Sequence, residues 1–510
     1  MSTETPARVA RAALRVDGLR IAIARRVLVD GVSFAVAPGE CVALVGESGA
    51  GKSLTVRALL GLLPEHAQVS AEALDVDGMD ALRLSEHGWR ELRGARIALV
   101  AQDALVSLDP LRRIGAEVAE PLEIHGSLPR SARDDRVREL LADVSMPDPD
   151  RRARQRPHEL SGGLRQRALI ASALAADPAV LIADEPTTAL DATVQARVLA
   201  LLRRIADDGT AVVFVSHDMA AVRRIADRVV VLRDGVVVEQ GAAGEVLTAP
   251  RHEYTRELVR ASAPAPRAAP VAEAPILATV QGVGKSFDRP VLRDVAFVLR
   301  EGRTLGVVGE SGSGKTTLAR ILLGVESADA GTAVWRGGAR PRIQLVHQNP
   351  LGAFDPRWTI ARSLREALAA GGVARAERAG RVTELLHEVD LDPALADRRP
   401  AALSGGQRQR AAIARALAAD PEVLVLDEPV SALDATVRTR ILALLDRLQR
   451  DRGLTMLLIS HDLAVVSAVA DDVLVMQDGV IVEQGPSAQV LGAPQHPFTR
   501  ELVAASGGSA

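Results

Sequence analysis

Two glycine-rich stretches contain the residue types that bind phosphate. They read GESGAGKS at residues 46–53 and GESGSGKT at residues 309–316, and each follows an apolar run. Glycines let backbone N–H groups converge on one anion, the lysine places a cation near the β- and γ-phosphates, and the last hydroxyl can ligate Mg²⁺. Each stretch therefore predicts a phosphate-binding loop between a strand and a helix. The predicted nucleotide-binding residues are Gly46, Glu47, Ser48, Gly49, Ala50, Gly51, Lys52 and Ser53 in the first loop and Gly309, Glu310, Ser311, Gly312, Ser313, Gly314, Lys315 and Thr316 in the second, with Ser53 and Thr316 also on the metal.

An acidic pair ends a second apolar run in each half of the chain. The pairs are Asp184-Glu185 and Asp427-Glu428. We expect each aspartate to hold Mg²⁺ through water or hydroxyl, and each glutamate to polarise the attacking water as a general base. A single glutamate at a strand end is also compatible with a mere surface charge. Its recurrence directly after the aspartate in both halves favours the catalytic interpretation.

The chain is an internal duplication. Ser161 and Ser404 are 243 residues apart, as are Asp184 and Asp427, so this part of each copy is almost free of insertions. From the phosphate-loop lysine to a later glutamine there are 50 residues in the first copy and 33 in the second, which leaves 17 extra residues in the first copy around residues 75–94. We expect those extra residues to form a peripheral segment.

The elements that must position these residues are buried strands alternating with helices. Short runs rich in β-branched residues occur at 41–47, 179–185, 211–218 and 228–235, separated by Ala/Leu/Arg-rich helical patterns. This alternation predicts an α/β fold with a largely parallel sheet flanked by helices. We predict two tandem P-loop NTPase domains, at residues 1–260 and 276–510. Residues 261–275 between them contain four prolines and no apolar periodicity, which predicts an extended linker.

Composition narrows the class of protein. The 510 residues carry a net charge of −3, so no global positive field is present to hold a nucleic-acid backbone. The single cysteine, Cys41, excludes an internal disulfide, and its apolar surroundings predict a buried strand residue. No run approaches the roughly 18 consecutive apolar residues of a membrane-spanning helix. We therefore expect a cytosolic chain that does not bind nucleic acid.

Two further strings identify the family. LSGGLRQR at 160–167 and LSGGQRQR at 403–410 resemble the signature of the ABC ATPases, which adds a helical signature subdomain to each predicted domain. Gln102 and Gln348 resemble that family's Q-loop glutamine, with catalytic and metal-binding roles, and His217 and His461 resemble its switch histidine. The ALD strings at 189–191 and 432–434 resemble its D-loop. The resemblance covers both halves and implies ATP as the nucleotide with Mg²⁺.

In that family two such domains stack head to tail, and each ATP lies between one phosphate loop and the signature of the other domain. The resemblance therefore implies intramolecular pairing of the two domains. It also adds nucleotide contacts from the N-terminus of each signature helix, where N–H groups favour an anion. These predicted contacts are Ser161, Gly162 and Gly163 in the first copy and Ser404, Gly405 and Gly406 in the second.

The two copies differ at two positions that are expected to affect nucleotide binding. Phe287 fits the aromatic residue that stacks on adenine, whereas the matching region of the first copy offers only Ile23 or Ala24. Leu164 in the first signature stands where the second has Gln407, which predicts weaker polar contacts at the site that the first signature completes.

The tails after each copy indicate a branch of the family. APRHEYTRELVRASAP at 249–264 and APQHPFTRELVAASG at 493–507 resemble the C-terminal motif of oligopeptide and dipeptide importer ATPases, a motif shared by nickel and glutathione importers. An ordinary terminal helix anchored by Tyr254 or Phe498 is the simpler interpretation. The resemblance implies two integral-membrane permease subunits as partners, contacted near Gln102–Pro121 and Gln348–Leu364, and an extracytoplasmic solute-binding protein. The chain would then sit on the inner face of the cell membrane.

Two other classes remain as alternatives. Soluble tandem ABC ATPases act on ribosomes or DNA. The ribosomal type is expected to carry a longer charged connector and basic surfaces, and the DNA-repair type zinc cysteines, and none of these features appears in this sequence. An interaction protein with degenerate sites is the other alternative. Both copies keep the lysine, aspartate, glutamate and histidine, which argues against degeneracy.

Overall fold

The chain forms two compact units. The computed structural model describes residues 12–102, 104–126, 128–187, 190, 192–262, 267, 274–310, 312–431 and 433–506. Met1–Leu190 and Val194–Ser262 make up the first unit, and the second consists mainly of Ala263–Ala510; we call them the first and second domains. Helix α11 runs from Glu253 to Ser262 and so includes the first two residues of the predicted linker. The extended conformation predicted for that linker falls mostly on residues 263–266 and 268–273, which lie outside the described residues.

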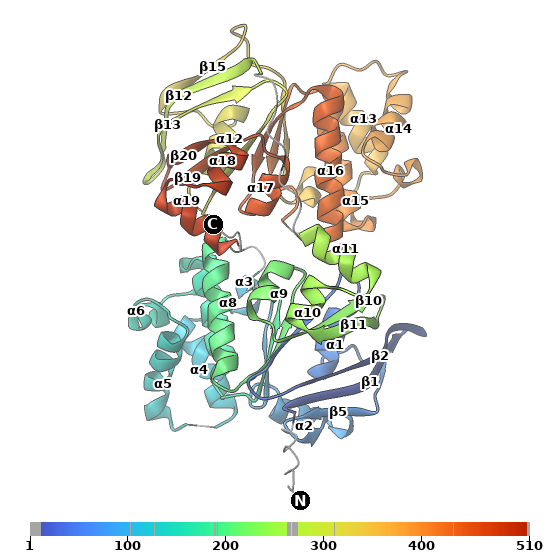
Figure 1. Cartoon of the computed structure of the whole chain (residues 1–510), viewed down its shortest axis with the longest axis vertical. Helices are drawn as coiled ribbons and strands as arrows, with labels where there is room; N and C mark the ends of the chain where they lie inside the picture. The colour runs from blue at the N-terminus through green and yellow to red at the C-terminus, as the bar shows by residue number, and fades with distance from the viewer. Residues whose placement is uncertain are drawn as a thin grey trace, which may run out of the picture. The chain divides into compact units, whose positions relative to one another are not determined.

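A sheet of six strands forms the centre of the first domain. Its strands β10 and β11 are labelled in Figure 1. Its order is β11-β10-β3-β9-β8-β7, and all neighbouring strands are parallel except β10 and β11. Side chains of strand β3 (Cys41–Val45) alternate between two core clusters. Cys41, Ala43 and Val45 lie on one face of the sheet, and Val42 and Leu44 lie on the other. The prediction of an α/β fold with a largely parallel core sheet is confirmed. The strands are β3 (Cys41–Val45), β7 (Ile97–Val100), β8 (Val180–Asp184), β9 (Ala211–Val215), β10 (Arg228–Arg233) and β11 (Val236–Ala242).

Cys41 lies within this core, as its apolar surroundings predicted. Only 1% of the residue is exposed, and burial raises the pKa of its thiol to about 12. The thiol therefore stays protonated at neutral pH and packs as a small apolar side chain.

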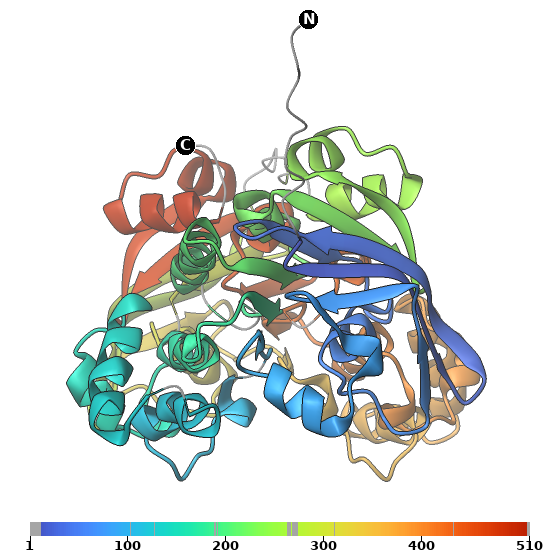
Figure 2. The same cartoon turned by 90° about the horizontal axis from the view of Figure 1, so that it is seen from below.

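A smaller antiparallel sheet and a helical region flank the core sheet of the first domain. Strand β1 (Leu14–Ile23) pairs with β2 (Arg26–Val36), β4 (Ala67–Ser70) and β5 (Ala73–Val76). Figures 1 and 2 show helices α4 to α6 on the side of the domain away from β1 and β2. The helices of four or more residues are α1 (Lys52–Leu59), α2 (Glu86–Leu92), α3 (Ala104–Ser107), α4 (Ile114–Ile124), α5 (Arg130–Asp143), α6 (Pro149–Arg154), α7 (Gly162–Leu174), α8 (Ala192–Asp207), α9 (Met219–Ile225), α10 (Ala243–Thr248) and α11.

The extra residues of the first copy are folded and packed. They form the hairpin of β5 and β6 (Met79–Asp80), a short 3₁₀ turn and helix α2. Leu92 is 1% exposed, and the ring of Trp89 lies against Gly61, where an added Cβ would stand 2.5 Å from it. Val76, Ala81 and Leu92 of this segment are buried, whereas its other residues are half-buried or exposed, so the segment packs on the core from the surface of the first domain and is peripheral as expected.

The second domain repeats the plan. Its core sheet has the order β16-β17-β18-β14-β19-β20, and the smaller sheet has the order β13-β12-β15. Among the described residues of the chain, none of the helices is long and apolar enough to cross a bilayer. The strands are β12 (Ile276–Ser286), β13 (Pro290–Arg300), β14 (Thr304–Gly309), β15 (Ala330–Trp335), β16 (Ile343–Val346), β17 (Val423–Asp427), β18 (Thr455–Ile459), β19 (Asp472–Gln477) and β20 (Val480–Pro486). The α-helices are α12 (Lys315–Leu323), α13 (Ile360–Ala370), α14 (Arg378–Glu388), α15 (Gly405–Leu417), α16 (Ala435–Arg452), α17 (Leu463–Val469), α18 (Ser487–Gly492) and α19 (Pro497–Ala505).

Arg267, a described residue of the predicted linker, is bound to the second domain by its side chain. The Arg267 guanidinium lies 2.8 Å from the carboxylate of Asp471, whose side chain is 3% exposed, and 3.2 Å from that of Asp446. It also donates a hydrogen bond of 2.6 Å to Gln449. A cation from the linker thus pairs with one carboxylate of α16 and with the carboxylate that directly precedes β19.

In the first domain, the carboxylate that corresponds to Asp471 is Asp227, and an arginine of the domain itself pairs with it. Arg203 of helix α8 donates to Asp227 at 2.8 Å and to the carbonyl of Gly39 at 3.2 Å. The position 243 residues later in helix α16 is Asp446, so the second domain has an acid where the first has the base. Arg267 supplies the positive charge that this exchange removed.

Candidate active site

The phosphate-binding loop of the first domain connects β3 to α1, as predicted. Gly51 caps α1 with a φ of 101°, and Gly46 has a φ of 152°, with its Cα so near β10 that a Cβ would stand 2.3 Å from the carbonyl oxygen of Leu232. Lys52 is 6% exposed, and its ammonium donates to the carbonyls of Gly46 at 2.7 Å and Glu47 at 2.9 Å. The loop therefore folds around the lysine that the sequence assigns to the phosphates.

The loop of the second domain has the same geometry. Lys315 is 8% exposed and donates to the carbonyls of Gly309 at 2.8 Å and Glu310 at 2.7 Å. Gly314 caps α12 with a φ of 100°. Ser311, a predicted nucleotide contact, lies outside the described residues.

Each predicted general base is held between a glutamine and a histidine. In the first domain, Gln102 Nε2 lies 2.9 Å from one carboxylate oxygen of Glu185, and His217 Nδ1 lies 3.1 Å from the other. In the second domain the corresponding distances to Glu428 are 2.7 Å from Gln348 and 3.0 Å from His461.

The backbone of both glutamates is strained in the same way. Each has a φ of 47°, the left-handed region that non-glycine residues rarely adopt. Glu185 follows β8 and its N–H bonds the carbonyl of Val215 at the end of β9, while Glu428 makes the matching bond to Ile459. Parallel strands present their carboxyl ends at one edge, which explains why residues far apart in the sequence meet here.

The aspartate before each glutamate has a raised carboxyl pKa. Burial is the main cause for Asp184 and Asp427, and the adjacent glutamate raises it further, while Lys52 and Lys315 act in the opposite direction. Two neighbouring carboxylates in a half-buried position fit a divalent cation, since a nearby positive charge offsets both effects. The donor set of Ser53, Asp184 and Gln102, and its counterpart in the second domain, Thr316, Asp427 and Gln348, is therefore suited to Mg²⁺.

The signature residues form a second group in each domain, at the start of α7 and of α15. Gly163 and Gly406 are required by packing, because an added Cβ would stand 2.2 Å from Val194 and 2.4 Å from Val437 respectively. Ser404 caps its helix by accepting from the Gln407 N–H at 3.3 Å, while the Gln407 side chain accepts from the Ser404 N–H at 3.0 Å.

The first signature lacks this capping arrangement. Ser161 makes no side-chain capping bond, and Leu164 packs against the core at the position of Gln407. A leucine side chain cannot accept from the serine N–H as Gln407 does, so this capping bond of the second signature has no counterpart in the first. In the predicted D-loops, Ala189, Asp191 and Ala432 lie outside the described residues, whereas Asp434 caps α16 by accepting from the Val437 N–H at 2.9 Å.

The aromatic residue predicted to stack on adenine lies at an exposed turn of the second domain. Phe287 lies at the turn between β12 and β13, is 58% exposed, and has the Lys285 ammonium 5.3 Å from its ring centre. In the first domain the equivalent turn consists of Ala24 and Arg25, with φ values of 48° and 66°. That turn contains no aromatic residue, as the sequence indicated.

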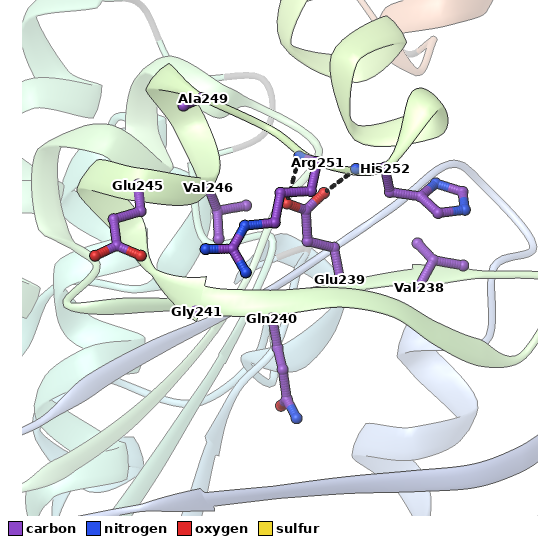
Figure 3. A pocket seen from close by; sticks show the side chains of 9 residues that line it. All are labelled: Val238, Glu239, Gln240, Gly241, Glu245, Val246, Ala249, Arg251 and His252. Atoms are coloured by element: carbon purple, nitrogen blue, oxygen red, sulfur yellow. Dashed lines mark hydrogen bonds between the residues drawn. The ribbon is translucent and has the colours of Figure 1, made fainter.

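The tail segment is built around a glutamate that the sequence analysis did not single out. Glu239 of β11 accepts from the N–H groups of Arg251 at 2.8 Å and His252 at 3.0 Å, just before α11 (Figure 3). Burial acts to raise the pKa of Glu239, but these bonds and the Thr255 hydroxyl lower it. Glu483 makes the same pair of bonds in the second domain. The glutamate lies 12 and 13 residues before its two partners, which is beyond the reach of a local sequence pattern.

The fold and the site together define a tandem P-loop ATPase with ABC-type signatures. The ABC transporter family model matches residues 29–188 and 292–431, and the model of the oligopeptide/dipeptide transporter C-terminal region matches residues 238–286. The chain belongs to the ABC transporter family and is an ATPase of that family.

Relatives of known function match along nearly the whole chain. A peptidoglycan transport ATP-binding protein, YejF, of Agrobacterium fabrum is 43% identical, covering 95% of this chain and 93% of the relative. The glutathione import ATP-binding protein GsiA of Escherichia coli O157:H7 is 39% identical, covering 94% of this chain and 86% of the relative. Among solved structures, the RNase-L inhibitor aligns with a TM-score of 0.64 at 21% identity over 94% of both chains, which supports the tandem fold alone.

Proposed function

We propose that this chain is the ATP-hydrolysing subunit of an ABC importer for peptides or a related small solute. The observation that carries the proposal is the repeated arrangement around Glu185 and Glu428, each held by a glutamine and a histidine at the strand ends beside a phosphate loop. The match of the tail region to oligopeptide and dipeptide transporters, and relatives named for peptidoglycan transport and glutathione import, support the solute class.

The geometry supports hydrolysis by direct attack of water on the γ-phosphate. Glu185 and Glu428 would accept the proton of the attacking water, and the glutamine and histidine on either side fix the direction of each carboxylate. Lys52 and Lys315 would exchange their carbonyl partners for phosphate oxygens. A Mg²⁺ ion held by Ser53, Asp184 and Gln102, or by Thr316, Asp427 and Gln348, would neutralise charge on the phosphates.

The experiment that tests the activity is the double variant Glu185→Gln with Glu428→Gln. Turnover of MgATP by the full chain should fall at least 100-fold, while nucleotide binding stays within about threefold, because only the proton acceptor is removed. Binding is measured by equilibrium titration with a fluorescent ATP analogue. Undiminished turnover in the double variant would disprove the assignment of the base.

We also propose that the chain works on the inner face of the membrane through two permease subunits, with an extracytoplasmic solute-binding protein in the complete system. Val106 and Leu111, 82% and 77% exposed, place apolar surface within Gln102–Pro121, the region expected to contact a permease. The chain should sediment with native membranes and not with liposomes that lack permeases. Co-purification with ribosomes instead would favour the alternative class.

The two ATP sites are proposed to be composite. Lys52 and the signature serine Ser404 would serve one ATP, and Lys315 and Ser161 the other, as the resemblance of both signatures implies. Such pairing within one chain would make site assembly intramolecular, with an effective concentration on the order of millimolar.

A further inference from the structure

The tail of the first domain contacts its phosphate-binding loop directly. Tyr254 lies in the first turn of α11 and is 3% exposed. Its hydroxyl accepts a hydrogen bond of 2.9 Å from the backbone N–H of Glu47, the second residue of the loop. The Arg233 guanidinium, at the end of β10, lies over the tyrosine ring, 5.0 Å from its centre.

In both domains the same hydrogen bonds before the last helix place an aromatic ring at the same position. His252 Nδ1 accepts from the Tyr254 N–H at 3.2 Å, and His496 Nδ1 accepts from the Phe498 N–H at 3.3 Å. Glu239 and Glu483 fix the two histidines in the same manner. The ring position is thus a shared feature of the fold, whereas the hydroxyl occurs in the first domain alone.

The residue next to the ring also differs between the two domains. The last residue of β10 is Arg233, and the last residue of β19 in the second domain is Gln477. The cation over the ring and the hydroxyl on the loop therefore occur together in one domain and are both replaced in the other. Packing of an aromatic side chain explains neither replacement, since Phe498 is also buried, at 6% exposure.

We propose that Tyr254 is a positioning residue of the first ATP site and makes the tail segment a determinant of nucleotide affinity there. Lys52 holds the carbonyl of Glu47 and Tyr254 holds its N–H, so both groups of the residue are fixed before nucleotide arrives. A loop already in its binding conformation loses less conformational entropy on binding. The hydroxyl contact does not depend on Lys52, and so it persists when the lysine turns to the phosphates. The inference rests on the nucleotide sites of the proposed function.

The test is Tyr254→Phe, which keeps the ring and removes one oxygen atom. It is combined with Lys315→Ala, which silences the second loop, in the full chain carrying Glu185→Gln and Glu428→Gln to prevent turnover. We expect the Kd for MgATP at the first loop to rise threefold to tenfold, as the loss of one hydrogen bond predicts. With Lys52→Ala in place of Lys315→Ala, the same tyrosine variant should leave the remaining Kd unchanged within 1.5-fold.

Two further readouts separate positioning from packing. In the chain with both glutamates intact, Tyr254→Phe should raise KM for ATP and leave kcat within twofold, and Arg233→Gln should shift KM in the same direction by a smaller factor. A lowered melting temperature with an unchanged Kd would assign Tyr254 to packing and overturn the proposal, as would an equal shift in the Lys52→Ala background. If neither lysine variant weakens nucleotide binding, the proposed sites themselves are wrong, which is a distinct outcome.

Discussion

Glu428 and His461 maintain each other's charge. Burial acts to raise the pKa of Glu428, but the hydrogen bond and charge of His461 lower it below the ordinary 4.5. Burial acts to lower the pKa of His461, but Glu428 raises it above the ordinary 6.5. The carboxylate thus stays ionised until the pH falls through its lowered pKa, and the imidazole stays charged until the pH rises through its raised pKa. Both groups are therefore mainly charged between pH 4.5 and 6.5, and the ion pair persists somewhat beyond both limits.

Removing the histidine charge should therefore move the acid limb of the reaction. In His461→Gln a hydrogen-bonding group remains but the positive charge is lost, so burial dominates and the pKa of Glu428 rises. The kcat profile of a Glu185→Gln background should lose activity at a higher pH on acidification, by roughly one pH unit for a 1.4 kcal/mol change in interaction. An acid limb that does not move would show that solvent, and not His461, sets the charge of the base.

Helix capping distinguishes the two signature helices. Ser404 and Gln407 exchange bonds at the start of α15, whereas Ser161 makes no side-chain capping bond at the start of α7. Ser404→Ala should cost about 1 kcal/mol of local stability, and the amides of the first turn of α15 should exchange about fivefold faster in hydrogen–deuterium exchange. Ser161→Ala is the matched control and should leave α7 unchanged. Equal effects in both helices would contradict this difference in capping by the two serines.

The positions of the motif residues that directly follow buried strands could be predicted from the sequence. Asp184, Glu185 and His217 could be placed together because each follows a buried strand, and parallel strands share an edge. The contact between Tyr254 and Glu47 could not be foreseen, since 207 residues separate the two and no periodic pattern links them. The same limit applied to the insertion at 75–94, whose buried side chains are too few to form a recognisable period and depend on the surrounding core.

Pairing of the domains can be tested by coupling between substitutions. If Lys52 and Ser404 serve one ATP, adding Ser404→Ala to Lys52→Ala should change little, because both damage a single site. Adding Ser161→Ala to Lys52→Ala should remove the remaining ATPase, since both sites are then damaged. Steady-state turnover of the two double variants decides between them. If the pair Lys52→Ala and Ser404→Ala is additive while Lys52→Ala and Ser161→Ala is redundant, each domain completes its own site.

The linker is held on the second domain at Arg267. We attribute this contact to the presence of Asp446 in α16 at the position where the first domain has Arg203. Arg267 neutralises Asp446 and the buried Asp471, a task that Arg203 performs on Asp227 from within the first domain. Arg267→Ala would leave Asp471 without its cation in a site that is 3% exposed, at a cost of about 3 kcal/mol. We expect the transition of the second domain in differential scanning calorimetry to shift to lower temperature.

The decisive variant restores the arrangement of the first domain. Asp446→Arg combined with Arg267→Ala returns a cation to α16 at the position of Arg203, and should recover most of the lost stability while releasing the linker. Asp446→Arg alone places two cations in competition for Asp471, so Arg267 should be displaced and trypsin should cleave after it sooner than in the unsubstituted chain. Mass spectrometry of a digestion time course identifies that cleavage. If the double variant melts no higher than Arg267→Ala, or if the rate of cleavage after Arg267 is unchanged in Asp446→Arg, the charge exchange does not explain why the linker is held there.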